Sequence, residues 1–181
     1  MIPRLVFAIC AVACGRGSHP RNPDAIPTTT GTIEVDGELG EPDWSRRALR
    51  HVFTAPNGDR ARPFSEVRLL HDEQNLYVGL YAADENIQSS DFFDVKIGDT
   101  AFRINPGARI MPAIAGCHAG VDLDGSLDDN SNDDEEWVLE IAMPLASVAS
   151  VASGQAHVSR CDIPKDGIQR CGAWSGSLSL E

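Results

Sequence analysis

A run of carboxylate side chains between residues 122 and 136 is the densest group of potential metal ligands in this sequence. The segment reads DLDGSLDDNSNDDEE, so eight of its side chains are Asp or Glu. Calcium prefers several oxygen ligands on a flexible loop, and Asp-x-Asp-Gly often begins such a loop. Asp122, Asp124 and Asp128 are therefore candidate Ca²⁺ ligands, and no other cofactor is expected for the main function proposed below. The spacing does not match an EF-hand, so a solvated surface loop without metal is the simpler interpretation.

Cysteine and histidine spacing favours structural roles over catalysis. Cys161 and Cys171 flank a short segment that contains proline and glycine, so they are the expected disulfide pair in an oxidising compartment. Cys117 is left over and is expected to be a small buried hydrophobic residue. Its neighbour His118 is a poor activating base, because adjacent side chains rarely point at each other. The five histidines show no zinc-binding spacing.

The N-terminus is typical of an exported protein. Residues 5–13 form an uncharged apolar run, LVFAICAVA, after a start with one basic residue. This run is too short to span a bilayer, which takes roughly 20 residues, and it predicts a signal peptide. The small residues before Cys14 resemble a bacterial lipobox, so residues 1–13 are expected to be removed and Cys14 lipidated. Cys10 is a rival position, and simple secretion or no export are the alternatives.

Composition and charge narrow the range of partners and locations. Residues 14–30 are rich in proline and small polar side chains, which predicts a flexible tether before a single domain at residues 31–181.

The formal charge is −12, which repels phosphate backbones, so nucleic acid is not expected as a partner. The protein is predicted to be an exported, membrane-anchored lipoprotein in the outer membrane, in the periplasm or at the cell surface. Its contact with the membrane is expected to be through the lipid only.

The remainder of the chain carries the period-two alternation of β-strands. The strongest alternation covers residues 76–83, 92–97, 100–105 and 137–143. Short helices are expected at residues 44–52 and 145–151. Many short strands separated by Gly, Pro and Asp favour an all-β sandwich or barrel.

Three segments resemble family 9 carbohydrate-binding modules (CBM9). Residues 32–44, TIEVDGELGEPDW, are similar to the opening block of that family. Residues 66–78, EVRLLHDEQNLYV, are similar to its second block, and residues 137–145, WVLEIAMPL, to a late strand. The blocks occur in the family's order, and together they cover roughly residues 31–181. The resemblance implies an antiparallel β-sandwich of the CBM9-like or DOMON-like type with one or two short helices.

The resemblance also implies a set of sugar-binding residues. In these modules two tryptophans clamp the sugar at the end of a chain, while charged and amide side chains bind its hydroxyl groups. The matching residues are Asp94, Arg103 and Asn105, with Trp174 as the second tryptophan. Trp174 also alternates with apolar residues, so a core position is its alternative.

The other tryptophan of the clamp is missing from this sequence, because Ser89-Ser90 precede the matching strand. Phe92 could offer a smaller ring on the same side as Asp94. Trp44 and Trp137 are expected to be core residues instead. Sugar affinity is therefore expected to be weak, or the ligand different.

The expected function is a non-catalytic module on a cell-envelope lipoprotein that binds saccharide chain ends. Related modules accompany polysaccharide-degrading enzymes such as xylanases, so such an enzyme is the expected partner. Asp94 and Glu140 lie in no recognisable hydrolase motif. One alternative is a haem-binding redox module with Met111 and His118 as ligands, although the sequence has no C-x-x-C-H motif. A second alternative is a structural envelope lipoprotein that binds another protein.

Overall fold

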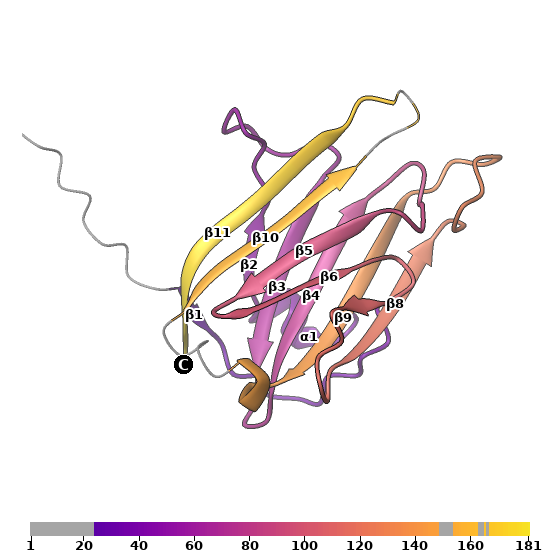
Figure 1. Cartoon of the computed structure of the whole chain (residues 1–181). Helices are drawn as coiled ribbons and strands as arrows, with labels where there is room; N and C mark the ends of the chain where they lie inside the picture. Colours follow the sequence, from indigo (N-terminus) through magenta and orange to yellow (C-terminus); the bar gives the residue numbers. More distant parts are fainter. Residues whose placement is uncertain (1–23, 149–153, 163–164, 166) are drawn as a thin grey trace, which may run out of the picture.

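Two β-sheets packed against each other make up the protein (Figure 1). The computed structural model describes residues 24–148, 154–162, 165 and 167–181. The predicted signal peptide, Cys14 and residues 14–23 of the predicted tether lie outside the described residues. The all-β sandwich expected from the sequence is confirmed, and its strands pair antiparallel except that β1 runs parallel to β11.

The six-stranded sheet has the order β1-β11-β10-β5-β6-β7. Its strands are β1 (Asp24–Ile26), β11 (Arg170–Leu180), β10 (Gln155–Asp162), β5 (Phe92–Ile97), β6 (Thr100–Ile104) and β7 (Ile110–Met111). The five-stranded sheet has the order β2-β3-β4-β9-β8. Its strands are β2 (Leu49–Val52), β3 (Ser65–His71), β4 (Asn75–Ala83), β9 (Glu136–Pro144) and β8 (His118–Asp124). The two helical segments are α1 (Pro42–Arg46) and the 3-10 turn η1 (Leu145–Val148).

The core between the sheets follows directly from side-chain alternation. Successive residues of a strand point to opposite faces, so every second side chain of each strand enters the core. On β5 these are Phe93, Val95 and Ile97, and Trp137 on β9 packs against Phe93 at a ring distance of 5.0 Å. Trp137 is fully buried, which confirms its expected core role.

The opposite face of the five-stranded sheet is covered by the chain before β2. Ile33 and Trp44 form a second apolar cluster there with Leu70, Tyr77 and Ala142. Trp44 is 2% exposed, so it too is a core residue, as expected. This cover explains why β9 is buried on both faces and reads as a nearly continuous apolar run.

Close backbone approach holds this N-terminal cover on the sheet. The carboxylate of Glu140 on β9 accepts hydrogen bonds from the N–H groups of Asp36 and Gly37, each at 3.0 Å. A Cβ atom at Gly120 on β8 would lie only 2.5 Å from the carbonyl oxygen of Val35. Only glycine leaves room for the covering chain at this crossing.

The domain begins earlier than the predicted boundary at residue 31. Residues 24–26 form β1, and the carboxylate of Asp43 accepts hydrogen bonds from the hydroxyl groups of Thr29 and Thr30. Ile26 is fully buried in the main core, and backbone pairing and side-chain hydrogen bonds hold the residues around it. One buried apolar side chain among mostly polar residues leaves no periodic pattern, so the sequence did not predict this role. The predicted helix at residues 44–52 is also shorter than expected, since α1 ends at Arg46 and β2 takes up residues 49–52.

The disulfide between Cys161 and Cys171 is confirmed. The two residues oppose each other directly in the β10–β11 pair, so the bond closes a hairpin. Cys117 is half-buried, and burial raises the pKa of its thiol, as expected for a structural cysteine. Neither helical segment of the described chain has the length and apolar character that a bilayer crossing needs.

Candidate saccharide-binding face

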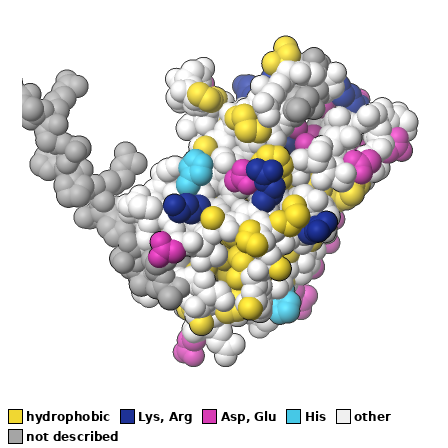
Figure 2. All heavy atoms as spheres, viewed as in Figure 1, with side chains coloured by type: hydrophobic (Ala, Val, Ile, Leu, Met, Phe, Trp, Pro, Cys, Tyr) yellow, Lys and Arg dark blue, Asp and Glu magenta, His cyan; other side chains and the backbone are white. Residues whose placement is uncertain are grey.

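The outer face of the six-stranded sheet, pointing away from the core, holds two of the predicted binding residues. Directly opposed residues of paired strands share a face. Strand pairing sets Ala173 of β11 opposite Ser159 of β10, Ser159 opposite Asp94 of β5, and Asp94 opposite Arg103 of β6. We call these four residues the outer row. Figure 2 views the molecule from this side and shows basic, acidic and histidine side chains on the surface.

Arg103 and Asp94 form a two-pronged ion pair in the outer row. Nε and Nη2 of Arg103 donate to Oδ1 and Oδ2 of Asp94 at 2.8 and 2.9 Å. The guanidinium also lies 3.4 Å from the ring centre of Phe92, in cation–π geometry. Both charged side chains are exposed, at 44% and 45%. The contacts hold the planar guanidinium in place, and Nη1 has no hydrogen-bond partner among the described residues.

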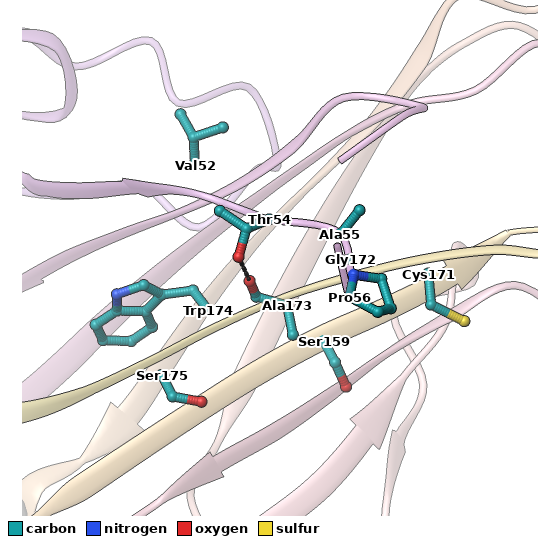
Figure 3. Close-up of a pocket in the computed structure, with 10 residues that line it drawn as sticks. All are labelled: Val52, Thr54, Ala55, Pro56, Ser159, Cys171, Gly172, Ala173, Trp174 and Ser175. Atoms are coloured by element: carbon teal, nitrogen blue, oxygen red, sulfur yellow. Dashed lines mark hydrogen bonds between the residues drawn. The ribbon is translucent and has the colours of Figure 1, made fainter. Parts of the chain in front are cut away.

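Two hollows flank β10 on this side of the molecule. The larger, of about 450 Å³, lies beside β11 and is lined by Thr54, Pro56, Ser159, Trp174 and Ser175 among others (Figure 3). The smaller, of about 310 Å³, lies over β5 and β6 and is lined by side chains that include Asp94, Lys96, Arg103 and His157. The outer row connects the two hollows across the sheet.

The Thr54 segment forms one wall of the larger hollow. Thr54 and Ala173 exchange both of their backbone hydrogen bonds, at 2.9 and 3.0 Å, so the chain after β2 joins the edge of β11. The chain after β2 thus passes from the five-stranded sheet to the six-stranded sheet and borders the hollow that Ser159 also lines. Sequence inspection does not predict Ser159 as a site residue, because nothing in the sequence shows that β10 lies beside β5.

Trp174 does not share the face of Asp94 and Arg103. In the β10–β11 pair Trp174 lies opposite Val158, which is 1% exposed and faces the core. The Trp174 side chain therefore leaves β11 on its core-facing side. Its ring is half-buried and stacks on His51 of β2 at 4.3 Å, where it closes the edge of the sandwich. Trp174 therefore takes the core-edge position that the sequence allowed as its alternative, and it also lines the larger hollow.

Asn105 follows β6 and is engaged by the turns around it. Its Nδ2 donates to the carbonyl oxygen of Ser89 at 3.2 Å, and its Oδ1 accepts from the N–H of Arg109 at 3.2 Å. The amide thus ties two loops together at the end of the outer face. Its expected role in binding hydroxyl groups stays a prediction, with one Nδ2 hydrogen still available.

The candidate calcium ligands are not brought together. Asp122, Asp124 and Asp128 are exposed, and Oδ1 of Asp128 accepts the N–H of Ser89. Asp134 is the buried member of the acidic segment, and it accepts N–H groups of Ile87 and Ser126 at 2.8 Å each. These carboxylates shape the loop instead of surrounding a shared centre.

A different group of carboxylates has cation-binding spacing. Asp84, Asp91 and Asp162 are buried, and one oxygen from each lies within 4.8 Å of the others. Arg160 already supplies a positive charge there, with Nη2 at 2.6 Å from Asp84 and 3.2 Å from Asp162. Trp137 adds a hydrogen bond from Nε1 to Asp84. The cluster lies between the two sheets and joins the ends of β4, β5, β9 and β10.

The two candidate haem ligands lie on different sheets. Met111 ends β7 and lines the smaller hollow beside Arg103, whereas His118 begins β8 on the five-stranded sheet. The residues that line this hollow do not include His118. Neither of the two hollows on the outer face is lined by both residues.

Two CBM9 modules are among the solved structures that resemble this sandwich. One is a CBM9 module from Caldicellulosiruptor kristjanssonii in complex with cellotriose, with a TM-score of 0.60, 13% sequence identity and coverage of 87% of this chain and 94% of that one. The other is a CBM9 module from the same organism in complex with glucose, with a TM-score of 0.58, 12% identity and coverage of 87% and 96%.

This chain has a CBM9-like fold. No protein-family model and no curated protein matches its sequence significantly. At this low identity the similarity concerns the fold alone.

The buried acids between the two sheets should make stability depend on pH. Burial raises the pKa of Asp91 from 3.8 to about 7 and that of Asp162 to about 6. Each acid then holds its proton in the folded chain at a pH where the unfolded chain has lost it. The contribution of this raised pKa to the free energy of unfolding is complete below pH 3.8 and is lost as the pH rises to about 7.

Replacing Asp91 with Asn should therefore flatten the decline of unfolding free energy between pH 5 and 7, by up to about 1.4 kcal/mol per pH unit. Urea unfolding at several pH values measures this slope. Asp129→Asn is the control, because Asp129 is exposed and its pKa is lowered. An unchanged slope in Asp91→Asn would contradict the assignment.

Proposed function

We propose that this chain is a non-catalytic carbohydrate-binding module whose ligand lies along the outer row. The main support for the proposal is the exposed Arg103–Asp94 ion pair, which lies between the two hollows and next to Ser159. A planar guanidinium with free donors, a carboxylate and a hydroxyl group are side chains that bind sugar hydroxyls.

The dimensions of the outer row suit a short oligosaccharide. Neighbouring strands are roughly 4.8 Å apart, so the row from β11 to β6 extends over about 14 Å. Its ends open into the larger hollow at Ala173 and the smaller hollow at Arg103. The solved CBM9 structures with cellotriose and glucose lend support, because saccharides are the ligands in their complexes.

Affinity should be modest because the outer face offers little aromatic surface. The guanidinium of Arg103 covers one face of Phe92, and Trp174 stacks on His51 at the sandwich edge. Sugar rings gain much of their affinity from contact with flat aromatic faces. Binding here depends mainly on hydrogen bonds, which contribute less in water because they replace bonds to solvent.

The arrangement of carboxylates favours binding without catalysis. A glycosidase places two carboxyl groups roughly 5 to 9.5 Å apart on either side of the bond it cleaves. Asp94 points outward from the six-stranded sheet, whereas Glu140 on the other sheet points away from the core towards Asp36 and Gly37. The two carboxylates thus face opposite sides of the sandwich. We propose that the module acts by holding a polysaccharide near a separate degrading enzyme.

Titration calorimetry with cellotriose and xylotriose tests the site. Arg103→Ala should weaken binding roughly tenfold or more, because hydrogen bonds from a charged group contribute about 1.5–3 kcal/mol. The matched control is Arg46→Ala, which removes the same side chain from α1, beside the opposite face of the sandwich. Equal binding by both variants, or no binding by the unaltered protein, would reject the site.

We also propose that lipid at Cys14 attaches the module to a membrane. The support is the short apolar run that ends in small residues before Cys14. β1 begins ten residues later, at Asp24, so the linking segment is shorter than the sequence suggested.

Cell fractionation tests the anchor. Cys14→Ser should move the protein from the membrane fraction to the soluble one, whereas Cys10→Ser should leave it membrane-bound with an acyl mass on its N-terminal residue. Retention of Cys14→Ser in the membrane would overturn the assignment.

A further inference from the structure

The smaller hollow on the outer face has an unusual balance of polar groups. Its charged side chains are Asp94, Lys96 and Arg103. Both oxygens of Asp94 accept hydrogen bonds from Arg103, so this pair is neutral as a unit. Lys96 is exposed and has no ion-pair or hydrogen-bond partner among the described residues. The hollow therefore carries one uncompensated positive charge in a chain of formal charge −12.

The hydrogen-bonding groups that remain for a ligand in this hollow are mainly donors. The ammonium group of Lys96 has three N–H donors and no acceptor, and Nη1 of Arg103 has two free donors. Arg103 occupies one acceptor site on each oxygen of Asp94. A neutral sugar hydroxyl can both donate and accept, whereas a carboxylate only accepts, so a carboxylate matches this donor set better.

Strand register brings these donors to one place. Lys96 lies opposite His157 on one side and Ala101 on the other, and Arg103 is two residues beyond Ala101. Diagonal neighbours of this kind are roughly 7–8 Å apart at their backbones, which long side chains can bridge. Asp94 and the small Ala101 flank the diagonal between Lys96 and Arg103, and all four residues line the smaller hollow.

We infer that the saccharide bound on the outer face is acidic, with a uronic acid carboxylate held between Lys96 and Arg103. The inference rests on the proposed carbohydrate-binding function and adds the class of ligand. The hydroxyl groups of the same sugar chain contact Ser159 and the larger hollow, and the carboxylate occupies the smaller one.

The two lysines of the chain provide a matched test. Lys165 does not line the hollow, and its Nζ lies 2.6 Å from Oδ1 of Asp133. Lys165→Gln therefore changes the net charge by the same amount as Lys96→Gln and leaves the hollow intact. The probes are a glucuronic acid-substituted xylotriose and its carboxyl-reduced counterpart, which differ only in the carboxylate. Inorganic phosphate serves as a simple anion.

Calorimetry at low salt should show the acidic probe binding about three- to tenfold more tightly than the reduced one, as expected for one exposed charge contact with hydrogen bonds. Lys96→Gln should remove this preference and leave the reduced probe within twofold, while Lys165→Gln should change neither. Higher salt should weaken only the acidic probe, through screening.

Several results would overturn the inference. Equal affinity for the two probes, or a preference that survives Lys96→Gln, would leave a carbohydrate-binding module without acidic specificity. Phosphate binding as tight as that of the acidic probe would indicate a simple anion site. Failure of both probes and of cellotriose to bind would reject the proposed function together with the inference.

Discussion

The register of β5 between β10 and β6 determines what both faces of the six-stranded sheet can do. Side chains alternate along a strand, so a shift of one residue exchanges the two faces. In the observed register, Val95 and Phe102 fill the core, and Asp94 and Arg103 reach solvent. The slipped register would bury an ion pair and expose the apolar residues, and this cost makes the outer row a consequence of core packing.

Buried polar contacts hold the ends of these strands. Arg160 on β10 reaches Asp84 after β4, and Asp84 also accepts the indole N–H of Trp137 on β9. A buried pair of this kind adds little net stability compared with apolar residues, but the loss of one partner leaves an unpaired charge. The network therefore ties the two sheets together in one arrangement, with the buried Asp91, just before β5, beside Asp84 and Asp162.

The sequence predicted the strands well because their alternation is strong and local. Residues 92–97 and 100–105 read as a hairpin, and this places Asp94 and Arg103 on one face. The contribution of β10 could not be predicted in this way, because strand neighbours far apart in the chain leave no local pattern. Ser159 was missed for this reason.

The same limit applies to Trp174 and to the start of the domain. The alternation along β11 allowed either side for the indole, and the contact with His51 on the other sheet decides it. Residues 24–30 show no periodic apolar pattern. Backbone pairing with β11 and hydrogen bonds to Asp43 help to hold them in place, and neither leaves a signal in the sequence. Composition alone therefore predicted a tether that the fold shortens.

Amide chemical shifts measured during a cellotriose titration locate the ligand on one face of the sandwich. The largest changes should occur at Ser159, Asp94 and Arg103 and fade towards β8 and β9 on the other sheet. Changes centred on β8 and β9, with the outer row unaffected, would rule out saccharide binding by the outer row.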